Sequence, residues 1–151
     1  MMKRADTAQG NDPFDLKRFI SAQDGLYERA LNEIKNGQKR THWMWFIFPQ
    51  FDGLAYSATF QHYAIKSREE ARLYLNHPLL GARLVECTEV LLAVKGRTIS
   101  DIFGYPDDLK LKSSMTLFAQ VAEADSPFLR VLDKYFNGDR DFKTLQLLET
   151  A

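Results

Sequence analysis

The sequence predicts a mainly α-helical protein with a single compact domain of seven or eight short helices and little or no sheet. Three observations lead to this prediction. Helix start and stop signals are dense along residues 12–151, and apolar residues recur there at helical spacing. Both Asn-Gly pairs follow such apolar stretches instead of joining two alternating segments, so neither indicates a β-hairpin. Residues 1–11 are small and polar, which predicts a flexible N-terminal tail before a helical domain over residues 12–151.

Each expected helix begins at a residue whose side chain can cap the first turn, or at a proline that suits the first helical position. Glycine or Asn-Gly ends several of these helices, because both residues tolerate the left-handed backbone conformation. The expected starts are Asp12-Pro13, Asp24, Ser67 (a capping box with Glu70), His77-Pro78, Ser100, Pro106-Asp107, Ser126-Pro127 and Asp141. Residues 41–56 fit either a buried strand or a short helix, and Thr41 as an N-cap slightly favours the helix.

Composition excludes several classes of function. Twenty basic residues balance twenty acidic ones, so a nucleic-acid partner is not favoured. The single cysteine, Cys87, excludes an intrachain disulfide and a cysteine-based zinc site, and its apolar helix face is typical of a small hydrophobe. The three histidines lack metal-ligand spacing, so we expect no metal and no cofactor. No apolar run is long enough to span a membrane, and with no export signal and one thiol we expect a cytoplasmic protein.

Residues 39–57 contain both tryptophans of the chain, Trp43 and Trp45, among polar neighbours. Clustered aromatic rings with a few polar groups are typical of a ligand pocket. The commoner role of such an apolar run is simply to fill the core. Adjacent residues cannot all face one way, however, so one ring is left for a cleft, a partner or a second layer. The polar residues of this candidate site are Arg40, His42, Gln50 and Ser57.

A second candidate segment spans residues 106–118. Lys110, Ser113 and Ser114 lie three and four residues apart, which makes them neighbours on a helix. A lysine with two hydroxyls can bind a phosphate or a carboxylate. The alternative for Ser114 is structural, a hydrogen bond from its hydroxyl to the carbonyl oxygen four residues earlier.

The nonapeptide His42–Gln50, HWMWFIFPQ, identifies a family. The chain resembles a set of small bacterial domains of unknown function, number 1810, over about residues 12 to 149. The resemblance implies a helical fold and no established activity. Members are often labelled calpastatin, but calpastatin is a long disordered inhibitor, unlike this short, aromatic-rich and well-capped chain. Further marks of the resemblance are Asp12-Pro13-Phe14, Arg18-Phe19, Ala22-Gln23-Asp24, Tyr63-Ala64-Ile65, His77-Pro78, Asp101–Gly104 and Ser113–Phe118.

A looser resemblance is to the NAD- and ADP-ribose-associated N-glycosidases of the YbiA type. It rests on Ser57 with Gln61-His62-Tyr63, and on Met115 with Phe118-Ala119; the glutamate of that family's Ser-Ser-Glu-His motif is absent. The resemblance implies aromatic rings around a base or ribose, with Lys110 or Arg40 on a phosphate. N-glycosidase chemistry also needs a carboxylate. The choice stays open among Asp24, Glu86, Asp107 and Asp108.

These patterns give three hypotheses. The first is a small-molecule-binding domain or enzyme with an aromatic pocket for a nucleotide-like or phosphorylated ligand, with no catalytic residue assigned. It requires the two candidate segments to meet around one cleft. The second is a protein-interaction module that uses an exposed aromatic surface or a homodimer interface. The third and least favoured is a stacking platform for single-stranded nucleic acid. The expected ligand-binding residues are Arg40, His42, Trp43, Trp45, Gln50, Ser57, Lys110, Ser113 and Ser114.

Overall fold

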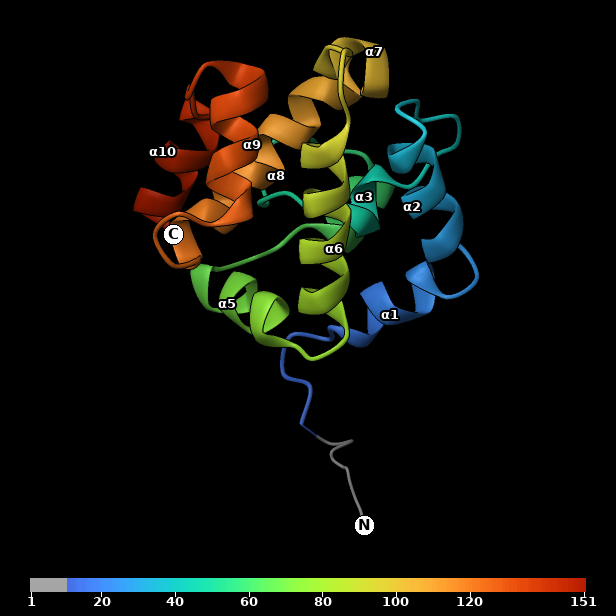
Figure 1. Cartoon of the computed structure of the whole chain (residues 1–151). Coiled ribbons are helices and arrows are strands. Elements are labelled where there is room, and N and C mark those ends of the chain that lie inside the picture. Colours follow the sequence, from blue (N-terminus) through green and yellow to red (C-terminus); the bar gives the residue numbers. More distant parts are fainter. Residues whose placement is uncertain (1–10) are drawn as a thin grey trace.

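The computed structural model describes residues 11–151, which form ten helices and no named strand (Figure 1). The helical fold class is therefore confirmed, with more helices than the expected seven or eight. The expected tail lies outside the described residues, except for Asn11. The helices are α1 (Lys17–Gln23), α2 (Tyr27–Lys35), α3 (Met44–Ile47), α4 (Ala58–Tyr63), α5 (Arg68–Asn76), α6 (Leu80–Ala93), α7 (Ile99–Phe103), α8 (Asp107–Val121), α9 (Pro127–Phe136) and α10 (Phe142–Thr150).

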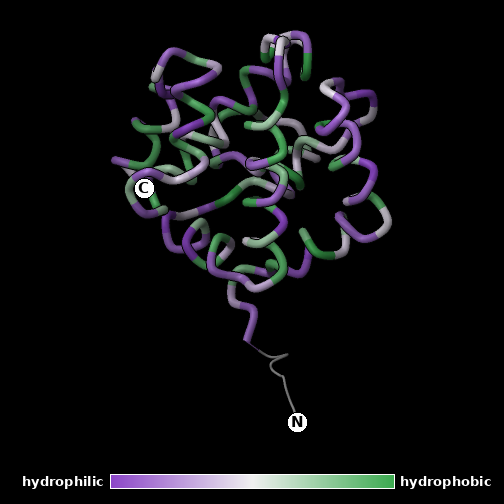
Figure 2. The backbone as a smooth tube through the Cα atoms, in the orientation of Figure 1, coloured by the Kyte–Doolittle hydropathy of each residue, from purple (hydrophilic) through white to green (hydrophobic). Residues whose placement is uncertain are grey.

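Two longer helices organise the packing. Helix α6 contacts α2, α5 and α9, and helix α8 contacts α3, α5, α7, α9 and α10. Hydrophobic and hydrophilic stretches alternate along the backbone, as amphipathic helices require (Figure 2). One continuous apolar core results, in which the largest fully enclosed rings are Trp43, Tyr74, Phe19, Phe48, Phe118 and Phe128.

Side-chain caps confirm several of the expected helix starts. Ser67, Ser126 and Asp141 each accept a hydrogen bond from the backbone N–H three residues later. At the start of α6, the ring Nδ1 of His77 accepts the backbone N–H groups of Leu79 and Leu80, at 3.1 and 3.2 Å. These contacts are local, which is why the sequence predicts them.

Other starts are displaced from their expected positions. Helix α1 begins at Lys17, about one turn later than expected, because Asp15 takes a left-handed conformation with φ of 53°. The Asp12 carboxylate still accepts the N–H of Leu16, across the extra residues, at 2.7 Å. Thr98, not Ser100, caps α7, in a reciprocal capping box with Asp101.

Residues 41–56, which fitted either a short helix or a buried strand, contain a short helix followed by an extended segment. Helix α3 has only four residues, and its N-cap is Trp43 without a side-chain bond, so the expectation that Thr41 caps it is wrong. The Thr41 hydroxyl donates instead to Glu33, at 2.7 Å. After α3 the chain extends, and Phe51 forms an isolated parallel bridge with Ile65. Among the described residues, none of the helices has the length and apolarity to cross a membrane.

Candidate functional site

Trp43 is part of the core. Its side chain is 1% exposed and contacts the rings of Phe48 and Phe103, with centroids 6.2 and 6.0 Å away. Its indole N–H donates a hydrogen bond of 2.8 Å to Oε1 of Glu33. The hydrogen-bond donor of this ring is therefore satisfied inside the protein, and the ring is too deeply buried to contact a ligand.

The Glu33 carboxylate also holds the backbone before Trp43. It accepts the N–H groups of Arg40 and Thr41 at 2.9 and 3.1 Å, in addition to the Thr41 hydroxyl. Burial opposes ionisation of this carboxyl, but the four hydrogen bonds outweigh burial and lower its pKa below the ordinary value. Glu33 on helix α2 thus holds the backbone of residues 40 and 41 in place, directly before the aromatic segment.

Trp45 differs from Trp43 in both exposure and bonding. It is only partly buried, and its indole N–H forms no hydrogen bond with another described residue. It lines a crevice with Gln50, Phe60 and Tyr63 that holds about 140 Å³ of empty space, too narrow for a water molecule. Of the two tryptophans, Trp45 is therefore the one that the core leaves partly exposed.

Gln50 supplies a second polar group with free hydrogen-bonding capacity. The residue is 5% exposed, and its backbone carbonyl accepts the N–H of Ile65 at 2.9 Å. Its side-chain amide bonds to no other described residue and faces the same crevice as Trp45. Its amide atoms are not among the fully enclosed groups without a partner, so they keep some exposure to solvent and are a candidate for ligand contact.

Lys110 lies on the other candidate segment and reaches the same tryptophan. Its Nζ is 6.0 Å from the centroid of a Trp45 ring and 3.4 Å from Asp107. Asp107 also pairs with Lys39 at 2.8 Å, and Nζ of Lys39 lies 4.9 Å from a ring of Trp43. Two ammonium groups share one carboxylate, so the cluster carries a net positive charge that favours an anion.

The structure thus brings Trp45, Gln50 and Lys110 together, three members of the expected set. Ser113 is turned toward α10, where its hydroxyl is 3.0 Å from the Asp141 carboxylate. The Ser114 hydroxyl is fully buried and has no partner in the described part of the chain, so the expected bond to the carbonyl four residues earlier is wrong. Of the remaining members, Arg40 and His42 are exposed, Ser57 is exposed and caps α4, and Trp43 is core.

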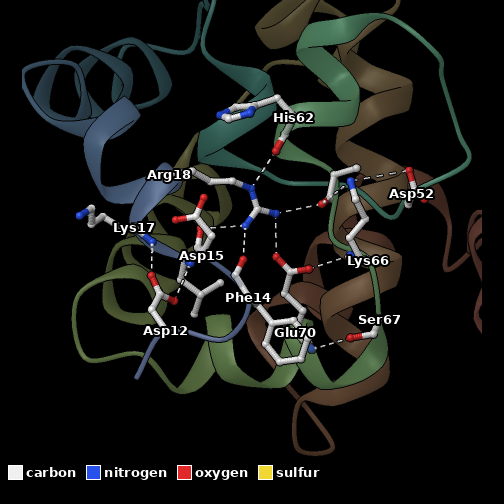
Figure 3. Close-up of polar contacts among 12 residues, drawn as sticks. Asp12, Phe14, Asp15, Lys17, Arg18, Asp52, His62, Lys66, Ser67 and Glu70 are labelled. Carbon is white, nitrogen blue, oxygen red and sulfur yellow. Dashed lines mark hydrogen bonds and ion pairs between the residues drawn. The ribbon is translucent and has the colours of Figure 1, made fainter. Parts of the chain in front are cut away.

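Two larger cavities lie elsewhere, beside residues 11–20, and sequence reasoning did not find them. Arg18 lines one of the two and pairs with Glu70 at 2.7 Å (Figure 3). The same guanidinium donates to the backbone carbonyls of Phe14 and His62, at 2.6 and 2.8 Å. The two side chains are 9% and 1% exposed, so this pair is structural, and a cavity of about 460 Å³ opens beside it.

Taken together, this is a compact helical domain with one half-buried tryptophan beside a cationic cluster. The chain belongs to the protein family of unknown function DUF1810, which it matches over residues 13–148. It is similar to the conserved hypothetical protein Rv1873 from Mycobacterium tuberculosis, whose crystal structure it matches with a TM-score of 0.90 and 52% sequence identity. That match covers 93% of this chain and 100% of the other. No protein with a curated description matches the chain.

Proposed function

We propose that this domain binds a nucleotide-like or phosphorylated aromatic small molecule at Trp45. One observation supports the proposal above others: the partly exposed Trp45 ring, whose N–H bonds to no other described residue, lines a crevice with Gln50 and lies 6.0 Å from the ammonium group of Lys110. These groups come from the two segments that the sequence singled out independently.

Each group has a distinct task in this proposal. The indole face stacks on a base or another flat ring, an interaction worth about 1–3 kcal/mol per base. Lys110 pairs with a phosphate or carboxylate, and the shared counter-ion Asp107 leaves it free to exchange partners. Because the crevice is too narrow for water, a ligand that reaches the Gln50 amide must first displace a lining side chain.

Asp107 is the carboxylate to test if the ligand is also cleaved. Of the four candidates for N-glycosidase chemistry, it is the one paired with Lys110 and hence tied to Trp45. Glu86 instead accepts a hydrogen bond from Tyr27, between α2 and α6. Release of free base from ADP-ribose, followed by chromatography, decides between a binding domain and an N-glycosidase. Loss of release in Asp107→Asn would assign the carboxylate.

Calorimetric titration with AMP, adenosine and ribose 5-phosphate tests the binding proposal. We expect AMP to bind more tightly than either fragment, because only AMP uses both the ring and the ammonium group. Trp45→Leu should weaken AMP at least tenfold. Lys110→Ala should weaken AMP but leave adenosine unchanged, whereas the control Lys112→Ala, two residues along α8, should alter neither. Absence of binding by all three probes, or full AMP affinity in both site variants, refutes the proposal.

A cytoplasmic location fits this function, and we propose it as well. Cys87 is a fully buried free thiol, which is typical of a reducing compartment. Phosphorylated metabolites are charged and are retained in the same compartment.

A protein-interaction module remains the second candidate, favoured by large exposed apolar side chains. Tyr105, Leu109 and Phe142 are 80%, 51% and 73% exposed. The bond between Ser113 and Asp141 holds the start of α10 against α8, so these side chains lie on neighbouring elements. A homodimer through this surface should appear in sedimentation velocity and be lost in Leu109→Lys and Phe142→Lys. A monomer at high concentration rejects it.

A further inference from the structure

A separate cavity of about 660 Å³ lies between the start of the described chain and the C-terminal end of α5. Its volume is in the range of small-molecule sites, about 300–1,000 Å³. Phe14, Ile20 and Leu73 line it with apolar surface, and Lys17, Asn76 and His77 line it with polar groups. None of these residues belongs to the Trp45 site.

His77 offers this cavity a donor of fixed orientation. Its Nδ1 accepts the backbone N–H groups that open α6, so the neutral ring carries its proton on Nε2. The Nε2–H donates to no other described residue. Burial lowers the pKa of this ring, and the opposing effect of Asp12 does not offset it. The ring is therefore neutral at pH 7. Because His77 lines the cavity, this free N–H is a candidate donor to a ligand there.

The other polar groups at this wall are also donors. The Lys17 ammonium and the Asn76 amide form no hydrogen bond with another described residue. The one carboxylate among the lining residues, Asp12, already accepts the backbone N–H groups of Leu16 and Lys17, at 2.7 and 3.0 Å. The positive end of the α6 dipole lies beside His77. Lys17 balances the charge of Asp12, so the lining is neutral overall, and its free N–H donors suit the oxygen atoms of a carboxylate.

The apolar side suits a hydrocarbon chain or ring. Leu73 is 40% exposed, although it lies beside other apolar residues. We propose that this cavity is a second binding site, for a small carboxylic acid with an apolar body. The carboxylate accepts from His77 Nε2–H and Asn76 and pairs with Lys17, while the body packs against Phe14, Ile20 and Leu73.

NMR titration of the ¹⁵N-labelled protein with octanoate and octan-1-ol tests this proposal. We expect octanoate to give saturable shifts confined to residues 12–20 and 73–80, with at least tenfold weaker binding of the alcohol. Leu73→Glu, a change at an exposed position, should abolish the octanoate response, and the control Leu109→Glu should not. His77→Asn keeps a capping acceptor but removes the Nε2 donor, so it should weaken octanoate more than octanol.

Trp45→Leu separates this proposal from the function proposed above, because it should leave octanoate binding unchanged. Equal binding of acid and alcohol, shifts spread over the whole surface, or equal losses in Leu73→Glu and Leu109→Glu would overturn the carboxylate site. None of these results bears on the AMP titration.

Discussion

The indole N–H of Trp43 donates a 2.8 Å hydrogen bond to Glu33, and these side chains are 1% and 9% exposed. The bond spans ten residues of sequence and joins α2 to the aromatic segment. It also distinguishes the two tryptophans by their hydrogen bonding. One is a core ring with a satisfied donor, and Trp45 is the ring whose donor is available.

Replacing Glu33 by alanine should destabilise the fold by about 3 kcal/mol. The change leaves the N–H of Trp43 and the donors of Arg40 and Thr41 without their acceptor, and each buried donor left unsatisfied costs about 1–3 kcal/mol. Urea unfolding followed by tryptophan fluorescence measures the loss. Glu28→Ala, at an exposed position of the same helix, should change stability by less than about 0.5 kcal/mol. Equal effects of the two substitutions would contradict this account.

The Arg18–Glu70 pair should behave as a buried ion pair. Removing either partner leaves an uncompensated charge, at a cost of about 3–5 kcal/mol. Arg18→Met and Glu70→Met should each destabilise strongly, and the double variant should lose less than the sum of the two. Asp52→Asn is the control, since its 3.9 Å contact with Lys66 is half-exposed and worth about 1 kcal/mol or less. A simple sum of the two losses in the double variant would mean that the side chains are not coupled.

His77 should make stability depend on pH. The pKa of its ring in the folded protein lies below the ordinary value of 6.5, so at mildly acidic pH the unfolded chain binds more protons than the folded one. The free energy of unfolding therefore rises with pH in this window. The contribution of His77 is complete above pH 6.5 and is lost as the pH falls through the folded-state pKa. Protonation of Nδ1 also removes the acceptor that caps α6.

The measurement is urea unfolding at several pH values between 5 and 8, for the natural protein and for His77→Asn. Asparagine caps helices well and does not titrate, so the variant should show a flatter profile with similar stability at pH 8. Parallel profiles would show that other groups cause the acid sensitivity.

The helical fold could be predicted from the sequence because its signals are local. The caps at Ser67, Ser126 and Asp141 each reach a backbone N–H three residues away. The structure places helix starts elsewhere where a distant partner competes, as when Glu33 draws the Thr41 hydroxyl away from α3. Helices α3 and α4 raise the count, because segments of four and six residues carry little periodic signal.

The candidate site could be predicted only in part. The sequence identified Trp45, Gln50 and Lys110 by residue type, and the pocket hypothesis required their two segments to meet, but the sequence did not show which of the nine expected residues would do so. The contact that joins the two candidate segments is that of Lys110 with Trp45, which are far apart in the sequence. Register and helix packing, which no single sequence reveals, set that contact.

Cys87 should be inert toward thiol reagents in the folded protein. It is fully buried, and burial raises the pKa of its thiol to about 12, so almost no thiolate exists at neutral pH. Reaction with a chromogenic disulfide at pH 7.5 should be undetectable in buffer and complete in denaturing urea. Labelling in buffer at the rate of a free cysteine would place this thiol at the surface.

Ser113 and Ser114 should respond to alanine with opposite signs. Ser113 is 3.0 Å from the Asp141 carboxylate, so Ser113→Ala should cost about 1 kcal/mol. The Ser114 hydroxyl is enclosed and has no partner among the described residues, so no hydrogen bond offsets the cost of its desolvation. Ser114→Ala removes that cost and improves helix propensity, so it should stabilise the fold by about 0.5–1 kcal/mol. Urea midpoints at constant m-value provide the comparison. Destabilisation by Ser114→Ala would show that this hydroxyl has a hydrogen-bond partner in solution, and would return it to the set of residues that can contact a ligand.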